Sequence, residues 1–243
     1  MLSVAYDLHI HSCLSPCGDP ASTPADIAGM AFIKGLDVFA LTDHNSARNC
    51  PAAKAAADAY GILFVPGMEL TTEEEVHVVC LFEEVEQALA FGEYVYPRIL
   101  DIENKPEIFG EQLVADENDV MIACERRLLI SATTISFDEV FALAEQFGGT
   151  AFPAHIEKAA NSLLANLGFI PPDAAFHTAE MKNPALYETL CPVHTYLKQC
   201  RVLKNSDAHT LEDISEAVNF LHVTERTPRG VIDAVRRGLR AAE

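Results

Sequence analysis

Histidine and acidic residues recur along this chain at the ends of short apolar runs that are typical of β-strands. The first run closes with His9 and His11, whose side chains point to the same side because a strand repeats every two residues. Imidazole and carboxylate groups are the usual protein ligands of zinc, manganese and iron. The set is larger than one ion can use: His9, His11, His44, Glu69, His77, His155, Asp207 and His209. The fold must therefore bring many strand ends together, and we expect a multinuclear metal site there.

Strand-like and helical segments alternate along most of the sequence. We expect strands near residues 4–8, 36–42, 62–66, 76–82, 150–153, 178–181, 201–206 and 217–223. We expect helices near residues 24–34, 50–60, 84–98, 137–147 and 228–240. Repeated strand–helix units predict an α/β fold whose parallel strands close into a barrel, with functional residues at the carboxyl ends of the strands.

Residues 99–135 interrupt this alternation. They carry many charges and show no clear strand pattern. We expect a mainly helical insertion that lies over the active-site end of the core. A length of 243 residues fits one domain of barrel size, so we expect a single domain over residues 1–243.

Charge and composition exclude several classes of partner. The 17 basic and 36 acidic residues give a formal net charge of -19. This balance disfavours long nucleic acids and anionic membranes, which would be repelled, although bound cations can still attract a short anionic substrate. No apolar stretch approaches the roughly 20 residues of a membrane span, and no secretory signal is visible. The seven scattered cysteines predict reduced thiols and a cytoplasmic location.

Five motifs resemble, in order and spacing, those of the PHP (polymerase and histidinol phosphatase) family: residues 7–11 (DLHIH), 42–45 (TDHN), 67–69 (GME), 153–155 (PAH) and 206–209 (SDAH). The resemblance runs from Asp7 to His209 and so covers most of the chain. It implies a distorted (β/α)7 barrel, metal ions at the carboxyl ends of the strands and hydrolysis of phosphate esters.

The resemblance also implies three sets of ligands: His9, His11, Glu69 and Asp207 for a first ion, Glu69, His77 and His155 for a second, and His44 and His209 for a third. The remaining ligand of the third ion would be a histidine or aspartate shortly after His11. This chain has Cys17 near that place and Asp19 two residues later. A thiolate would favour zinc or iron and a carboxylate would suit manganese. We favour Cys17 and keep two alternatives: Asp19, or no protein ligand at this position.

Such a site suits phosphate esters, which resist hydroxide because two anions repel each other. Two metal ions about 3.5–4 Å apart neutralise the phosphoryl oxygens and bring the pKa of a bridging water toward about 7. We therefore expect two or three divalent ions (manganese, zinc or iron) and a metal-bridging hydroxide, with phosphate or sulfate as ions that fit the site. The expected substrate is a phosphorylated metabolite, a nucleotide or a very short oligonucleotide. Glu69, Asp207 and His209 are the expected catalytic residues, through metal positioning.

Four further residues have supporting roles in this interpretation. Asp7 and Asp43 lie one strand step from ligands and are expected to orient imidazoles, with direct metal binding left open for Asp43. Lys158 is expected to meet a substrate phosphate as a point charge. His177, which precedes a strand, is a second candidate for that contact.

Two other classes of function fit parts of the pattern. A noncatalytic metal-binding scaffold would have lost several ligands, whereas only one position is uncertain here. An amidohydrolase-type enzyme that attacks C–N or C–O bonds also begins with a His-x-His motif, but commonly uses a lysine as its bridge. Glu69 in the bridging place argues against that class.

Overall fold

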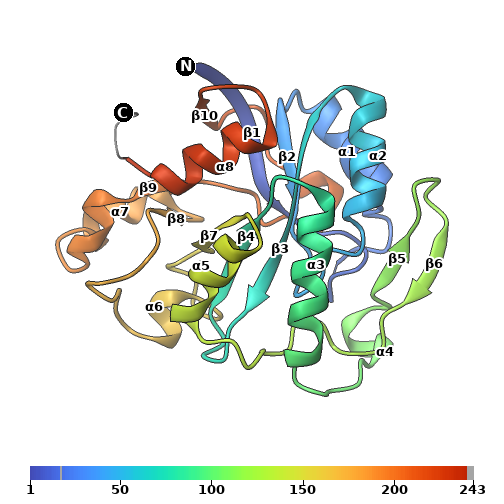
Figure 1. The fold of residues 1–243 in the computed structure, drawn as a ribbon, viewed down its shortest axis with the longest axis horizontal. Coiled ribbons are helices and arrows are strands. Elements are labelled where there is room, and N and C mark those ends of the chain that lie inside the picture. Colours follow the sequence, from blue (N-terminus) through green and yellow to red (C-terminus); the bar gives the residue numbers. More distant parts are fainter. Residues whose placement is uncertain (17, 240–243) are drawn as a thin grey trace.

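A curled sheet of six strands is the frame of this computed structural model, which describes residues 1–16 and 18–239. Its strands are β1 (Leu2–Ile10), β2 (Val38–Leu41), β3 (Leu63–Thr71), β4 (His77–Leu81), β7 (Thr150–Pro153) and β10 (Phe220–Val223). They lie in the order β10-β1-β2-β3-β4-β7 (Figure 1). Strands β1, β2 and β3 pair in parallel, whereas β4 and β10 pair antiparallel with their neighbours.

A second, two-stranded sheet completes the ring. Strands β8 (Thr178–Glu180) and β9 (Arg201–Leu203) pair in parallel, and β8 packs beside β7. The chain after β9 returns to β1 through a parallel bridge between Ile10 and Ala208, where the His11 N–H donates to the Ala208 carbonyl at 2.9 Å. The predicted distorted α/β barrel is confirmed, with the antiparallel strands β4 and β10 as departures from a parallel arrangement.

Helices cover the sheet on both faces. The longer ones are α1 (Pro24–Ile33), α2 (Cys50–Tyr60), α3 (Val85–Val95), α5 (Phe137–Gln146) and α8 (Pro228–Arg237). Shorter ones are α4 (Pro106–Phe109), α6 (Leu163–Asn166), α7 (Tyr187–Leu190) and the 3-10 helices Tyr96–Arg98, Pro184–Leu186, Thr195–Gln199 and Leu211–Asp213. Threonine side chains cap two of these helices at the amino end: the Thr23 hydroxyl accepts from Asp26 N–H at α1, and the Thr227 hydroxyl accepts from Gly230 N–H at α8.

Strand β2 illustrates why the sheet is buried on both faces. Phe39 and Leu41 belong to one apolar cluster, which they share with helices α1, α2, α3 and α5. Val38 and Ala40 belong to a second cluster on the other face, which contains the apolar side of α8. A near-continuous apolar run is what such a strand requires.

The insertion at residues 99–135 differs from the prediction of a mainly helical segment. It contains the four-residue helix α4 and a hairpin of β5 (Leu113–Ala115) and β6 (Met121–Cys124), which projects at one side of the molecule (Figure 1). The Asp116 carboxylate accepts hydrogen bonds from Asn118 N–H and Val120 N–H, which closes the turn between the strands. This turn chemistry, carried by charged residues, explains why the segment resembled a polar helix.

Two further properties concern the whole described part of the chain. None of its helices is long and apolar enough to cross a membrane. Its cysteines all carry free thiols: Cys13, Cys50, Cys80, Cys124, Cys191 and Cys200.

The position of Phe39 gives a test of the core. We expect Phe39→Ala to lower the free energy of unfolding by about 3–5 kcal/mol, because the side chain is fully buried beside Phe64 and its loss leaves a cavity. Phe32→Ala is the matched control: that ring is 55% exposed, and its loss should cost about 1 kcal/mol or less. Chemical denaturation measures both values, and equal losses would contradict the assignment of Phe39 to the core.

Candidate metal centre

The carboxylate of Glu69, on β3, is surrounded by imidazoles. Five histidines place a ring nitrogen within 3.4 Å of one of its oxygens: His9, His11, His44, His77 and His155. Strand pairing explains this crowding, because β3 pairs with β4, which begins at His77, and an isolated bridge joins Glu69 to His44. The Glu69 side chain is almost entirely buried, at 1% exposure.

Asp207 supplies a second carboxylate to the same cluster. Its Oδ1 lies 3.5 Å from His9 Nε2 and 3.4 Å from His11 Nε2. The ring of His209 stacks on that of His11 at a centroid distance of 4.3 Å. The Lys158 ammonium donates to Asp207 Oδ2 at 2.9 Å and is 44% exposed, so it lies at the rim of the cluster.

The side chains form three overlapping groups whose ligand atoms lie within 4.8 Å of one another: His9, His11, Glu69 and Asp207; His44, Glu69 and His77; and His11, His44 and His209. The first group is the expected set for one ion. The second group has Glu69 and His77 of the expected set, with His44 where His155 was expected. His155 Nε2 lies 3.2 Å from Glu69 Oε1. Each group is small and rich in imidazole, as a transition-metal site requires.

Several atoms of the cluster lack the partners that burial demands. His44 Nδ1 and Glu69 Oε2 lie 3.1 Å apart without hydrogen-bonding geometry, and neither has a hydrogen bond within the described residues. His77 Nε2 and His155 Nδ1 are also buried and have no hydrogen bond within the described residues. Buried polar atoms are almost always satisfied, so unpaired ligand atoms facing one another fit a cluster that holds cations.

The two central carboxylates are held in the charged form. Burial would raise the pKa of Glu69, but His77, His9 and His44 outweigh it and hold that pKa well below its usual range. Burial likewise opposes ionisation of Asp207, yet His9 and His11 lower its pKa. Both groups are therefore anionic at neutral pH, which is the form that binds metal ions.

The histidines divide into two kinds. Burial lowers the pKa of His11 to about 4 and that of His44 well below its usual value, so both are neutral at pH 7. Burial also opposes the charged form of His9, but the carboxylates of Glu180 and Glu69 outweigh it and raise the pKa of His9 well above its usual value. Without a metal, His9 therefore carries the compensating positive charge.

Asp43 acts on the cluster through a serine that the sequence analysis missed. Its oxygens accept from Ser12 N–H and from the hydroxyls of Ser12 and Ser15, each at 2.7 Å. The Ser15 hydroxyl lies 2.9 Å from His11 Nδ1, so it orients that ring. Asp43 thus binds Ser12 and Ser15, and through Ser15 it acts on the ring of His11, which agrees with an orienting role.

Asp7 also has a buried role, but a different one from that expected. It accepts from Ser206 N–H at 3.0 Å and Ser215 N–H at 2.9 Å. It therefore fixes the backbone just before Asp207 and contacts no imidazole through these bonds.

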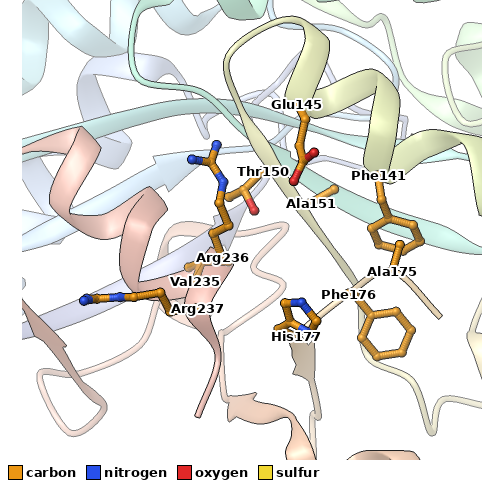
Figure 2. Close-up of a pocket in the computed structure, with 10 residues that line it drawn as sticks. All are labelled: Phe141, Glu145, Thr150, Ala151, Ala175, Phe176, His177, Val235, Arg236 and Arg237. Atoms are coloured by element: carbon orange, nitrogen blue, oxygen red, sulfur yellow. The ribbon is translucent and has the colours of Figure 1, made fainter. Parts of the chain in front are cut away.

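His177 lies away from the cluster. It precedes β8 at the amino-terminal end, whereas Glu180 at the carboxyl end lies 2.9 Å from His9 Nδ1. Figure 2 shows His177 and Arg236 lining a separate cavity of about 320 Å³. The length of β8, about 10 Å, separates His177 from the strand end that faces the cluster. The expected contact between His177 and a substrate phosphate stays a prediction.

The role of Cys17 as the remaining ligand of the third ion stays a prediction, because Cys17 lies outside the described residues. Its neighbour Asp19 donates its N–H to the His209 carbonyl at 2.9 Å, so this segment runs beside the cluster. The Asp19 carboxylate, however, accepts from Ala21 N–H at 2.8 Å and belongs to none of the three groups.

Glu180 is the main residue that the sequence analysis missed. Its carboxylate is fully buried and lies between the ring of His9 and the amide of Asn205. The signal was an acidic residue at the end of a predicted strand, the same signal that identified Glu69. It was overlooked because no recognised motif contains it.

Comparison with known proteins now places the chain. The PHP domain matches residues 7–165, about two thirds of its length. The chain belongs to the PHP family. It is 35% identical over 79 residues to a 5'-3' exoribonuclease of Haemophilus influenzae, and 38% identical over 90 residues to a 3',5'-nucleoside bisphosphate phosphatase of Chromobacterium violaceum. These segments cover 31% and 35% of this PHP protein and 28% and 30% of the relatives, so the match spans less than a third of their length.

Solved structures share the fold across nearly the whole PHP chain. The lesion-specific endonuclease PfuEndoQ from Pyrococcus furiosus has a TM-score of 0.70 at 20% identity, covering 97% of this chain and 56% of that one. An amidohydrolase from Chromobacterium violaceum with bound sulfate has a TM-score of 0.60 at 19% identity, covering 98% and 99%. At such identities the likeness concerns the fold alone.

The charge on His9 predicts a pH dependence in the metal-free PHP protein. A pKa raised by folding contributes stability that is present below about pH 6.5 and is lost as pH rises through the folded pKa. The difference in unfolding free energy between wild type and His9→Gln should therefore shrink from pH 6 to pH 9, by at most about 1.4 kcal/mol per pH unit.

Denaturation of chelated protein at several pH values measures this difference. The matched control is His222→Gln, which removes an exposed histidine on β10. A difference for His9→Gln that stays constant, or grows with pH, would contradict the assignment of charge to His9.

Proposed function

We propose that this protein is a metal-dependent phosphoesterase that hydrolyses a small phosphate ester with two or three divalent ions of manganese, zinc or iron. The observation that carries the proposal is the buried carboxylate of Glu69 among five imidazoles. Both of its oxygens face ring nitrogens, so it can bridge two ions. The membership in the PHP family and the names of the relatives support the same chemistry.

Each carboxylate has a distinct proposed task. Divalent ions bound by this cluster would neutralise phosphoryl charge and activate water for attack. Glu69 would fix their separation, and Asp207 would hold the first ion together with His9 and His11. His209, at 31% side-chain exposure, is the most accessible histidine of the cluster and would face the substrate side.

Lys158 is the proposed contact for the substrate phosphate. Its ammonium bonds to Asp207, and this carboxylate supports the charged form: burial would lower the pKa of Lys158, but Asp207 outweighs it and raises that pKa. An ammonium that is charged, half-exposed and next to a metal ligand can turn from the carboxylate to a phosphoryl oxygen.

The proposed substrates are phosphorylated metabolites, nucleotides and very short oligonucleotides. The net charge of -19 argues against a long nucleic acid, since its phosphates would be repelled outside the cluster. Two relatives carry the names of a nucleoside bisphosphate phosphatase and an exoribonuclease, so nucleoside bisphosphates and short RNA ends belong in the first screen. We also propose a cytoplasmic location, supported by the free thiols of the described cysteines.

Two rival proposals make different demands. A noncatalytic scaffold would tolerate loss of ligands, whereas three groups of imidazoles and carboxylates lie together within the described residues, which supports the enzyme proposal. An amidohydrolase would attack amides or lactones in preference to phosphate esters. A screen for phosphate release, with amide and lactone substrates and metal analysis in parallel, separates the three.

Removal of metal or of its bridge should abolish activity. Chelation should eliminate phosphate release, and Glu69→Ala should lower turnover by several orders of magnitude, because two cations without their bridging carboxylate repel each other. Glu86→Ala, an exposed glutamate on α3, is the control and should leave turnover unchanged. Near-normal turnover of Glu69→Ala with full metal content would refute the bridging role.

Lys158 should affect substrate binding more than turnover. We expect Lys158→Ala to raise KM for a phosphate ester about 10-fold, which corresponds to about 1.4 kcal/mol of lost binding. Lys198→Ala, an exposed lysine on a 3-10 helix, should leave KM unaltered. Steady-state kinetics at fixed metal concentration measures KM for both variants. An unchanged KM for Lys158→Ala would contradict the proposed contact.

A further inference from the structure

Glu180 ends strand β8 and is fully buried beside the cluster. Its carboxylate meets three nitrogen atoms, which come from three other parts of the barrel. Oε2 lies 2.9 Å from His9 Nδ1 and accepts from Asn205 Nδ2 at 2.7 Å. Oε1 accepts from the backbone N–H of His155 at 3.0 Å. Strand β1, the segment after β7 and the segment after β9 are therefore tied to one side chain.

All three partners must act as donors. The backbone N–H of His155 has no other option, and Asn205 is fixed because its Oδ1 already accepts from Leu8 N–H at 2.9 Å. An ionised carboxylate only accepts, so His9 must present Nδ1–H to it. The other ring nitrogen of His9, Nε2, is then free to bind a cation, and it is this nitrogen that faces Glu69 and Asp207.

The bond to His155 has a second consequence. His155 adopts a left-handed backbone with φ of 29°, which is unfavourable for a residue with a side chain. The carboxylate of Glu180 holds its N–H, and the Glu180 carbonyl accepts from the next residue, Ile156, at 2.9 Å. Glu180 thus supports the turn that directs the His155 ring toward Glu69.

We propose that Glu180 is a positioning residue that sets two ligands at once: it selects the His9 tautomer with Nε2 free and holds His155 in its left-handed turn. The family resemblance assigns His9 and His155 to the sets of two different ions, so in this proposal Glu180 couples two positions of the centre. This inference rests on the proposed metal centre, while the protonation of His9 can be tested without any metal.

Glu180→Gln tests the proposal with almost no change in shape. A glutamine has one acceptor and one donor end, so its NH₂ must face either His155 N–H or the pair of His9 Nδ1 and Asn205 Nδ2. In the second arrangement His9 becomes the acceptor and its proton moves to Nε2, which then cannot bind a cation. We expect zinc and manganese affinity, measured by competition with a chelator, to fall about 10–100-fold.

The tautomer of His9 supplies a readout that a purely structural role would not change. ¹⁵N spectra of histidine-labelled, metal-free protein, recorded at a pH where His9 is neutral, should show the proton on Nδ1 in wild type. In Glu180→Gln a substantial fraction should carry it on Nε2.

The matched control is Glu125→Gln. Glu125 is also a buried carboxylate with three donors, Arg48 Nη1, Tyr96 hydroxyl and Arg127 N–H, but it lies in the insertion. This variant should lose stability and keep both wild-type metal affinity and the wild-type tautomer of His9.

The outcomes are separable. A Glu180→Gln protein with undiminished metal affinity overturns the proposal, and so does a wild-type His9 whose neutral form carries its proton on Nε2. If Glu180→Gln does not fold, the wild-type spectrum alone decides, because a bare Nδ1 on His9 is incompatible with the role of Glu180. If wild type takes up no metal, the proposed function fails, whereas the tautomer still tests the positioning.

Discussion

The cost of burying negative charge governs this structure. Glu69, Asp207 and Glu180 are all removed from water within one cluster, and an uncompensated carboxylate in such a place is strongly destabilising. Imidazoles from separate strands supply the compensation, and His9 lies against all three carboxylates. The barrel fold makes this convergence possible, because the ends of many strands lie at the same end of the barrel.

The same convergence explains where the backbone is strained. Asn45, His155 and Asp207 follow strand ends and have positive φ angles of 48°, 29° and 52°. Such conformations persist only where surrounding contacts over-determine them. Asn45 shows how: its amide bonds to the carbonyls of Leu129 and Ser131, and its oxygen accepts from Thr71 N–H. Each sharp turn aims a side chain of the cluster or ties the insertion to it.

The sequence predicted the barrel and the members of the cluster because strands and ligands leave local patterns: apolar runs, and histidines at their ends. It missed Ser15 and Glu180 because a residue that orients a ligand is defined by a partner far along the chain. The hairpin in 99–135 was hidden by charged turn residues, and the antiparallel direction of β4 by a connection whose length alone does not fix direction. The distance of His177 from the cluster could not be foreseen, because the sequence does not show which end of the three-residue strand β8 faces the cluster.

The bridge between Ile10 and Ala208 sets the order in which this protein can assemble. Almost 200 residues separate the two partners, so the ring closes only when the residues as far as Ala208 are available. Contacts of such long range are slow to form, since loop-closure entropy must be overcome first. During synthesis His9 and His11 are made first, Glu69 follows, and Asp207 is made after all three. Until Asp207 is in place, the chain holds His9 and His11 without the Asp207 carboxylate that faces them, so closure of the barrel and completion of the cluster depend on the same long-range contacts.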